Sequence, residues 1–283
     1  MDFKDTRAIG LHVRLQNGLL DVVTAVQQQQ LQVAQSFLLD ERGKYVSCSS
    51  SVTKKFITQK RDLGFKYFVH AAYWSSLTNV KSKEFLSLSK ETDIALNLES
   101  DGIVVHVGAT KAGLSKQEQA QYVAEGINEL FHRVETIDVL LENGPHAGRN
   151  FGGDLTDFAL LENLIEQKHR VRYCIDTAHA FVYGYNMSNP YELKNFFTLL
   201  QTIFTDQSIA LLHLNDTQHG CASQIDKHGI PGQGVLGATV LQECMNFDLL
   251  ASIPIILELP GTCDDQQAVS VLKIVQSWDG LRS

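Results

Sequence analysis

The chain of 283 residues is 44% hydrophobic and 20% charged, and its formal net charge is −8. This composition indicates a globular protein with a large apolar core. It argues against a membrane protein, because no apolar run approaches the roughly 18 residues that a membrane span requires. The charged segment Met1–Asp5 lacks the apolar stretch of a signal peptide, so we expect a cytoplasmic protein.

The net charge and the cysteines further limit the class of protein. A negative chain is unlike a generic nucleic-acid binder, whose surface is usually basic. The five cysteines are scattered, odd in number and free of C-x-x-C spacing, so we expect reduced thiols rather than disulfides or a cysteine zinc site.

Eight short apolar segments rich in Val, Ile, Leu and aromatic residues are the predicted strands. They are Ala8–Leu15, Gln32–Leu39, Lys66–Tyr73, Gly102–Val107, Ile137–Asn143, Val171–Asp176, Ser208–Asn215 and Pro254–Leu259. Helical patterns separate them, which predicts a parallel sheet, and eight such units predict closure into a (β/α)₈ TIM barrel. Without a linker or a shift in composition, residues 1–283 are expected to form one domain.

Capping signals mark the starts of several of these helices. Ser115 and Glu118 form a capping box ahead of an apolar stripe. The pair Asn189-Pro190 supplies an N-cap and a proline at the first helical position. Thr156 or Asp157 is expected to cap a helix that carries Leu161 and the apolar residues after it.

Nine potential metal ligands fall at the carboxyl ends of the predicted strands or in the loops that follow. They are His70, His106, Glu142, Asp176, His179, His213, Asp226, His228 and Glu258. Loops at these ends build the active site of a (β/α)₈ barrel, so we expect the nine side chains to converge.

Each of these residues alone has an ordinary explanation, as a hydrogen-bonded histidine or as a helix cap. Four carboxylates at one rim would nevertheless repel one another and be costly to bury unless cations compensate them. Imidazole with carboxylate suits zinc, and also manganese or iron, and nine ligands can hold two or three ions if one carboxylate bridges. Three divalent ions would reduce the formal charge from −8 to −2, so that the chain could still attract a phosphate.

Three stretches of the sequence resemble signature motifs of the endonuclease IV family. One is Cys174-Ile-Asp-Thr-Ala-His-Ala-Phe181, and another is Leu141-Glu-Asn143. The third begins at His213-Leu-Asn-Asp216 and continues with Asp226-x-His228 and Gly232-x-Gly234. Further matches fill the remaining places in chain order: Gly10-Leu-His-Val13, His70-Ala-Ala-Tyr73, His106-Val-Gly108 and Leu257-Glu258.

This resemblance implies a barrel that holds three zinc ions, with Mn²⁺ or Fe²⁺ possible at one position. It assigns His70 and His106 to the first ion, with Glu142 bridging to the second. It assigns Asp176, His213 and Glu258 to the second ion, and His179, Asp226 and His228 to the third.

The same resemblance implies a monomeric DNA-repair endonuclease whose partner is double-stranded DNA with abasic sites or blocked 3′ ends. It would hydrolyse the phosphodiester on the 5′ side of an abasic site, leaving a 3′-hydroxyl and a 5′-deoxyribose phosphate, and remove 3′ blocking groups. Glu142 is the implied catalytic residue. In a bacterium the protein would be associated with the nucleoid.

Four residues are candidates for contact with DNA. Tyr73 and Trp74 follow the strand that carries His70, and on the family pattern they lie at the rim of the pocket, where an apolar wedge could fill the gap at an abasic site. Trp74 could instead pack under the next helix. Arg42, in a polar turn, is a second wedge candidate, and Lys227 is expected to point at a phosphate.

The chain departs from the family pattern at a few places. Arg14 stands where a serine is usual, Val107 where proline is common, and Gln233 where a glutamate lies between two glycines. The segment Gly144-Pro145-His146 replaces small residues. Of the histidines outside the ligand set, His12 is a candidate to support a ligand, and the others are expected to be structural or exposed.

Two other functions remain open on the sequence. Glu142, Asp176, His213 and Glu258 by themselves would satisfy a metal-dependent sugar isomerase or epimerase, and then the other ligands would be superfluous. A damage-binding protein without turnover is the second alternative, although none of the nine ligands is missing.

Overall fold

The computed structural model describes residues 7–40, 42–134, 136–205 and 208–279, and so the predicted lack of a signal peptide at Met1–Asp5 lies outside it. Eight parallel strands form a closed barrel, in which the first strand pairs with the last. In the order around the barrel they are β1 (Ile9–His12), β10 (Ile255–Leu257), β7 (Ile209–His213), β6 (Val171–Asp176), β5 (Val139–Glu142), β4 (Gly102–His106), β3 (Lys66–His70) and β2 (Val33–Phe37). The barrel fold predicted from the sequence is confirmed, with most strands shorter than predicted.

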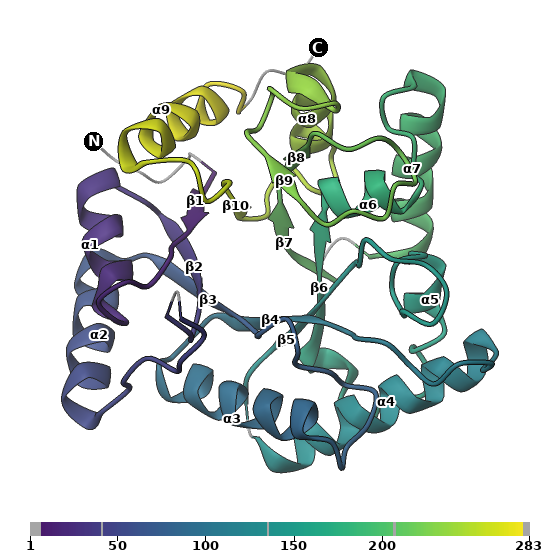
Figure 1. The fold of residues 1–283 in the computed structure, drawn as a ribbon, viewed down its shortest axis with the longest axis horizontal. Coiled ribbons are helices and arrows are strands. Elements are labelled where there is room, and N and C mark those ends of the chain that lie inside the picture. Colours follow the sequence, from purple (N-terminus) through teal and green to yellow (C-terminus); the bar gives the residue numbers. More distant parts are fainter. Residues whose placement is uncertain (1–6, 41, 135, 206–207, 280–283) are drawn as a thin grey trace.

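Helices form a ring outside the barrel, as seen down its axis in Figure 1. They are α1 (Leu20–Gln29), α2 (Ser50–Leu63), α3 (Lys83–Asn97), α4 (Lys116–Arg133), α5 (Thr156–Ala159), α6 (Thr177–Tyr183), α7 (Pro190–Ile203), α8 (Gly237–Asn246) and α9 (Asp265–Gln276). A short 3₁₀ segment, Lys168–Arg170, precedes β6. Within the described residues, none of the helices combines the length and apolar character needed to cross a membrane.

Two of the three predicted helix starts are confirmed. The Ser115 hydroxyl accepts from the Glu118 backbone N–H in a complete capping box, and the Asn189 side chain accepts from two N–H groups of α7. The expectation for Thr156 and Asp157 is wrong, because α5 has only four residues and neither residue caps it. Asp157 is instead buried, where it accepts from Gly152 N at 3.0 Å and pairs with Lys116 Nζ at 2.7 Å.

One layer of the barrel interior is apolar and takes one side chain from each of seven strands. It consists of Val33, Phe68, Val104, Leu140, Cys174, Leu211 and Ile256. The eighth strand contributes Gly10, where a Cβ would lie 1.7 Å from the carbonyl oxygen of Val33. Close approach of the backbone therefore closes the barrel at this level.

The next inward-facing layer is polar. Side chains alternate along a strand, so the residue two positions after each member of the apolar layer also points inward, nearer the carboxyl end. Those residues are His12, Gln35, His70, His106, Glu142, Asp176, His213 and Glu258. The barrel thus presents eight polar side chains at the end where such folds place their active sites.

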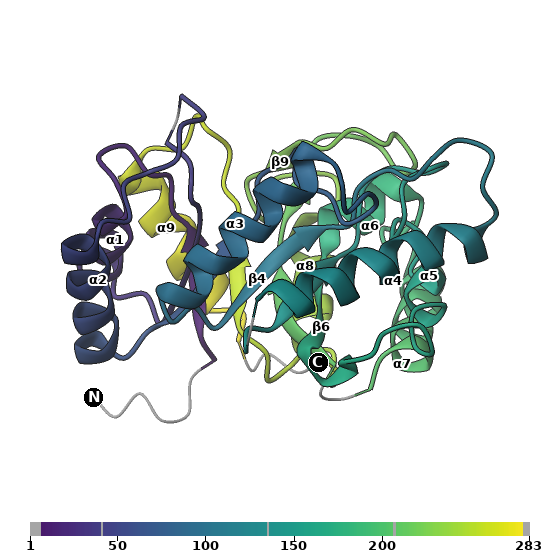
Figure 2. The same cartoon turned by 90° about the horizontal axis from the view of Figure 1, so that it is seen from below.

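A two-stranded antiparallel hairpin outside the barrel was not predicted from the sequence. It pairs β8 (Asp216–Thr217) with β9 (His228–Gly229), and β9 lies beyond the end toward which the β4 arrow points in Figure 2. The buried Asp216 carboxylate accepts backbone N–H groups of Gly232, Gly234 and Leu236 at 3.0 Å. This carboxylate holds the loop after β9 in place, which two-residue strands could not do by themselves.

Candidate metal centre

The nine predicted ligands come together at the carboxyl end of the barrel. Six belong to the polar layer, and they are placed by β3, β4, β5, β6, β7 and the residue after β10. His179 lies in the first turn of α6, three residues after Asp176, whose carboxylate caps that helix by accepting His179 N at 2.8 Å. Asp226 and His228 come from the hairpin loop and β9.

Glu142 lies at the centre of this cluster and is 1% exposed. Its Oε2 is 2.7 Å from His106 Nε2 and 3.1 Å from His70 Nε2. Its Oε1 faces the other way, 2.9 Å from His213 Nδ1 and 3.4 Å from His179 Nδ1. One carboxylate therefore contacts two separate groups of imidazoles, as a bridging ligand must.

A second group of donors surrounds His213. Its Nδ1 lies 3.6 Å from Glu258 Oε2 and 3.8 Å from Asp176 Oδ2. The Asn215 amide nitrogen joins the two acidic side chains, because it donates to Asp176 Oδ2 at 2.6 Å and to Glu258 Oε2 at 3.1 Å.

The third group lies toward the hairpin. Asp226 Oδ1 is 3.1 Å from His179 Nε2 and 3.7 Å from His228 Nε2. Asp176 Oδ2 also approaches, at 3.6 Å from His228 Nε2. His228 Nε2 is buried without a hydrogen-bond partner while it faces two carboxylates, and a cation would satisfy it.

The carboxylates and imidazoles of this cluster shift one another's pKa values. Burial raises the pKa of Glu142, but His106 and His213 outweigh burial and bring that pKa well below its ordinary value. Burial lowers the pKa of His179, but Asp176 and Asp226 outweigh it and raise that pKa well above the ordinary value. These carboxylates and imidazoles therefore favour one another's charged forms.

The donor set fits metal ions. The ligand atoms of His70, His106 and Glu142 lie within 4.8 Å of one another, as do those of Glu142, Asp176, His213 and Glu258. The same limit holds for Asp176, His179 and His228. Imidazole and carboxylate without thiolate suit zinc and also manganese or iron. This buried His, Asp and Glu cluster could therefore bind metal.

Two buried amides support the ligands, and sequence reasoning missed both. Gln35 Nε2 donates to Glu258 Oε1 at 3.0 Å, and His213 Nε2 lies 3.0 Å from Gln35 Oε1. Asn215 holds Asp176 and Glu258 as described above. Gln35 follows Val33 of the apolar layer by two positions, as each ligand of the polar layer follows its own apolar neighbour. This spacing could have identified Gln35 from the sequence. The His12 ring nitrogen Nδ1 lies 3.0 Å from Glu258 Oε1, in the supporting position that was considered for it.

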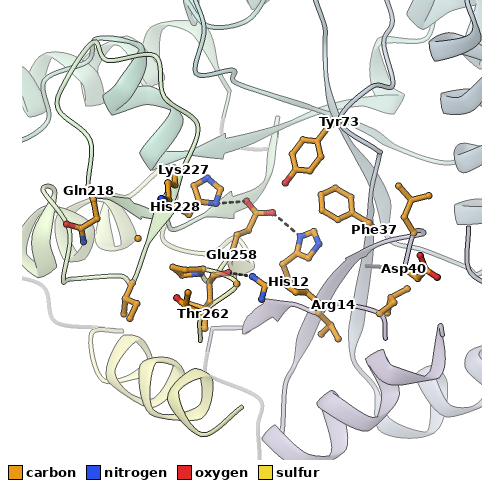
Figure 3. A pocket seen from close by; sticks show the side chains of 18 residues that line it. His12, Arg14, Phe37, Asp40, Tyr73, Gln218, Lys227, His228, Glu258 and Thr262 are labelled. Carbon is orange, nitrogen blue, oxygen red and sulfur yellow. Dashed lines mark hydrogen bonds and ion pairs between the residues drawn. The ribbon is translucent and has the colours of Figure 1, made fainter. Parts of the chain in front are cut away.

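A cleft of about 720 Å³ opens beside the cluster (Figure 3). His228 and Glu258 line it on the metal side, and Phe37 and Tyr73 give it an apolar wall. Lys227 also lines the cleft and is exposed, within reach of an anion bound there.

The remaining candidates for DNA contact lie at the rim. Tyr73 is 70% exposed and Trp74 is 47% exposed, so neither side chain is buried. The Trp74 indole N–H donates to Ser87 Oγ on α3 at 3.3 Å. Arg42 is exposed at the tip of a turn in which its backbone N–H donates to Asp40 Oδ1 at 2.9 Å.

The departures from the family pattern also lie around this end of the barrel. Arg14 donates to the Leu259 carbonyl at 2.7 Å and lines the cleft. Val107 is buried, while His146 and Gln233 are exposed.

Comparison with known proteins agrees with the barrel fold. The profile of the xylose isomerase-like TIM barrel family matches residues 30–275. The chain is 28% identical over 275 residues to a probable endonuclease 4 from Halothermothrix orenii, covering 94% of this chain and 99% of that one. It is 27% identical over 240 residues to a probable endonuclease 4 from Thermotoga petrophila, covering 82% and 83% of the two chains.

Solved structures share the barrel. The crystal structure of endonuclease IV from Thermus thermophilus matches with a TM-score of 0.81 at 23% identity, covering 96% of this chain and 98% of that one. A xylose isomerase domain protein from Planctomyces limnophilus matches with a TM-score of 0.68 at 13% identity, covering 97% of each. Since the family profile spans most of the sequence and these relatives are named endonuclease 4, the chain belongs to the xylose isomerase-like TIM barrel family and, within it, to the endonuclease IV family.

Proposed function

We propose that this protein is a zinc-dependent endonuclease that hydrolyses the DNA phosphodiester on the 5′ side of an abasic site and removes blocking groups from 3′ ends. It would act as a single-domain monomer in the cytoplasm, at the nucleoid if the source is a bacterium. The observation that carries the proposal is the joining of three donor groups by shared carboxylates. Glu142 belongs to two of these groups and Asp176 to two.

Three zinc ions are the occupancy that these donors favour, with Mn²⁺ or Fe²⁺ possible at one position. His70, His106 and Glu142 would hold one ion. Asp176, His213 and Glu258 would hold the next together with Glu142. His179, Asp226 and His228 would hold the third. Bound zinc would supply a water of lowered pKa and would stabilise negative charge on phosphate oxygens.

The residues of the chain would orient the reactants. Glu142 sits between the donor groups and would align the attacking water by accepting its hydrogen bond. Lys227, exposed at the edge of the cleft, would pair with a phosphate, and Tyr73 would place an apolar ring against the exposed sugar. Burial of Glu142, Asp176 and His213 keeps bulk water from screening these charges.

The third donor group distinguishes this proposal from a sugar isomerase. An isomerase would need only four of the ligands, which are Glu142, Asp176, His213 and Glu258. It would not need His179 and Asp226 to lie close to His228 Nε2, which is buried without a hydrogen-bond partner. A damage-binding protein without turnover would have no use for a bridging carboxylate in contact with both imidazole groups.

The test combines metal analysis with cleavage. Protein purified without added metal should contain about three zinc ions per chain, and it should cut a duplex that carries one tetrahydrofuran abasic analogue on the 5′ side of the analogue. A reproducible content near one ion would favour the isomerase. Stable binding of that duplex without cleavage, at full zinc occupancy, would favour the damage-binding protein.

A further inference from the structure

The buried carboxylate of Glu91 lies behind the rim and belongs to neither the metal cluster nor the barrel interior. Glu91 is on α3, on a helix face whose other buried residues include Phe85, Leu88 and Ala95, and it is 0% exposed. A carboxylate at such a position is costly, and burial raises the pKa of Glu91. An apolar residue would fill this place at lower cost, so the carboxylate needs another explanation.

The hydrogen bonds of Glu91 lead to two rim loops. Its Oε2 accepts the Ala72 backbone N–H at 2.8 Å, and its Oε1 accepts the Ser75 hydroxyl at 3.0 Å. These two donors flank Tyr73 and Trp74 in the chain. Glu91 therefore binds the loop after β3 on both sides of the two aromatic residues.

The second loop is held through Tyr45. The Tyr45 hydroxyl donates to Glu91 Oε1 at 3.0 Å and lies 2.6 Å from Ser87 Oγ. Tyr45 pairs with Leu39 in an isolated antiparallel bridge, which forms the base of the turn that carries Arg42. The ring contact between Phe37 and Tyr73, with centroids 5.0 Å apart, joins the end of β2 to the loop after β3 on the cleft side.

Ser87 completes the connection to Trp74. Its hydroxyl lies 3.1 Å from Glu91 Oε1 and accepts from the Trp74 indole N–H. A half-exposed tryptophan is thus connected to a fully buried carboxylate through one serine. A change at Glu91 should therefore be detectable at Trp74.

We infer that Glu91 is a positioning residue that fixes the loop of Tyr73 and Trp74 and the turn of Arg42 relative to each other before DNA binds. The inference rests on the proposed function for the use of these loops, whereas the anchoring itself does not require DNA. Side chains that are already ordered lose less conformational entropy on binding, and that saving is about 0.5–1.5 kcal/mol for each flexible side chain.

The experiment uses Trp74 as a reporter. The chain has two tryptophans, Trp74 and the buried Trp278, so Trp278→Phe leaves Trp74 as the sole indole emitter. In this background Glu91→Ala should increase acrylamide quenching of Trp74 and weaken binding of the abasic-analogue duplex roughly tenfold, with unchanged zinc content. Glu91→Gln should restore most of both properties, because its amide oxygen can still accept from Ala72 N.

Two further variants keep the test decisive if Glu91→Ala folds poorly. Tyr45→Phe removes the contacts of the Tyr45 hydroxyl with Glu91 and Ser87 but leaves Glu91 bound to Ala72 and Ser75, and it should weaken duplex binding about threefold with zinc content unchanged. Asp157→Ala is the matched control, because Asp157 is another buried carboxylate whose pKa burial raises, and it anchors a different loop. It should leave Trp74 quenching unchanged even if it lowers the melting temperature.

The inference would be overturned if Glu91→Ala left Trp74 quenching and duplex binding within twofold of the parent protein. It would also be overturned if Asp157→Ala changed Trp74 quenching as strongly, since a general loss of stability would then explain both. If the parent protein neither bound nor cut the abasic duplex, the proposed function would fail. Acrylamide quenching of Trp74 in the absence of DNA would still show whether Glu91 anchors the two loops.

Discussion

The side chain of Gln35 fixes which nitrogen of His213 faces Glu142. Gln35 Nε2 faces Glu258 Oε1 at 3.0 Å, and an ionised carboxylate only accepts, so the amide nitrogen must be on that side. Gln35 Oε1 therefore faces His213 Nε2 at 3.0 Å and accepts a hydrogen bond from its N–H. The other nitrogen, Nδ1, is left pointing at Glu142 Oε1, 2.9 Å away, where a metal ligand is needed.

We predict that Gln35→Leu lowers zinc affinity about 10- to 100-fold, because leucine can neither accept from His213 nor donate to Glu258. Competition with a chromophoric chelator measures this affinity. Ser36→Ala is the control, since the neighbouring Ser36 hydroxyl bonds to Tyr67 outside the cluster and its loss should leave zinc affinity unchanged. Equal effects of the two substitutions would contradict the role of Gln35.

Glu142→Gln should reduce the rate of cleavage of the abasic-analogue duplex at least about 10³-fold. A neutral amide bridges two cations poorly and leaves the imidazoles around it without their counter-charge. Single-turnover kinetics at saturating zinc measure the loss, and circular dichroism checks that the barrel is intact. A variant within tenfold of the parent rate would show that Glu142 is not the bridging residue.

Trp74→Ala should weaken binding to an abasic duplex by about 1–3 kcal/mol, the scale of one base–aromatic stack. The side chain is 47% exposed, so zinc content and melting temperature should hardly change. Internal incision should suffer more than trimming of a blocked 3′ end at a nick, where less unstacking is required. Equal losses on the two substrates would assign Trp74 to the structure instead.

Gly234→Ala should loosen the third metal position. A Cβ at residue 234 would lie 2.3 Å from Asp216 Oδ1 and 2.4 Å from the Thr217 carbonyl oxygen, so the hairpin would have to shift. We expect about 1–3 kcal/mol of destabilisation and a lower zinc content. Gly220→Ala, in the connection between β8 and β9 and with open space around its Cβ, should change neither. Unchanged zinc content in the Gly234 variant would show that Asp216 does not position the hairpin ligands.

Borohydride should trap no adduct between the protein and DNA with natural abasic sites. Hydrolysis at phosphorus needs no amine nucleophile, whereas a lyase would form a Schiff base with a lysine. Lys227 is the one lysine within the ligand motifs, and it lies between two ligands. Gel electrophoresis after reduction detects the adduct. Its appearance, and its disappearance in Lys227→Gln, would overturn the hydrolytic assignment.

The barrel was predictable because its signal repeats along the chain. Eight apolar segments alternate with helical ones. Within a strand, the two-residue alternation of side chains that points Leu140 into the barrel also points Glu142 inward. The same register applied to Val33 would have found Gln35, but a glutamine is not a metal ligand and so drew no notice. A search by residue type therefore identified the predicted ligands but missed Gln35 and Asn215, which hold them in place.

Other features depend on contacts that a linear pattern does not encode. The two-residue strands of the β8–β9 hairpin are too short for a periodicity, and they are held by the contacts of Asp216 with a loop about 20 residues later. The partners of Glu91 lie up to 46 residues away in the sequence. Asp157 looked like a helix cap by residue type, yet the structure uses it to pair with Lys116.

The pairing of β1 with β10 has a consequence for how the protein is made. A chain emerging from the ribosome would have His70 and His106 available long before Glu258, and the barrel cannot close until β10 has been synthesised. Until then the early histidines would offer only a loose, incomplete set of donors. Metal uptake at full affinity would therefore follow translation of β10, and products that terminate before it would compete poorly for the metal.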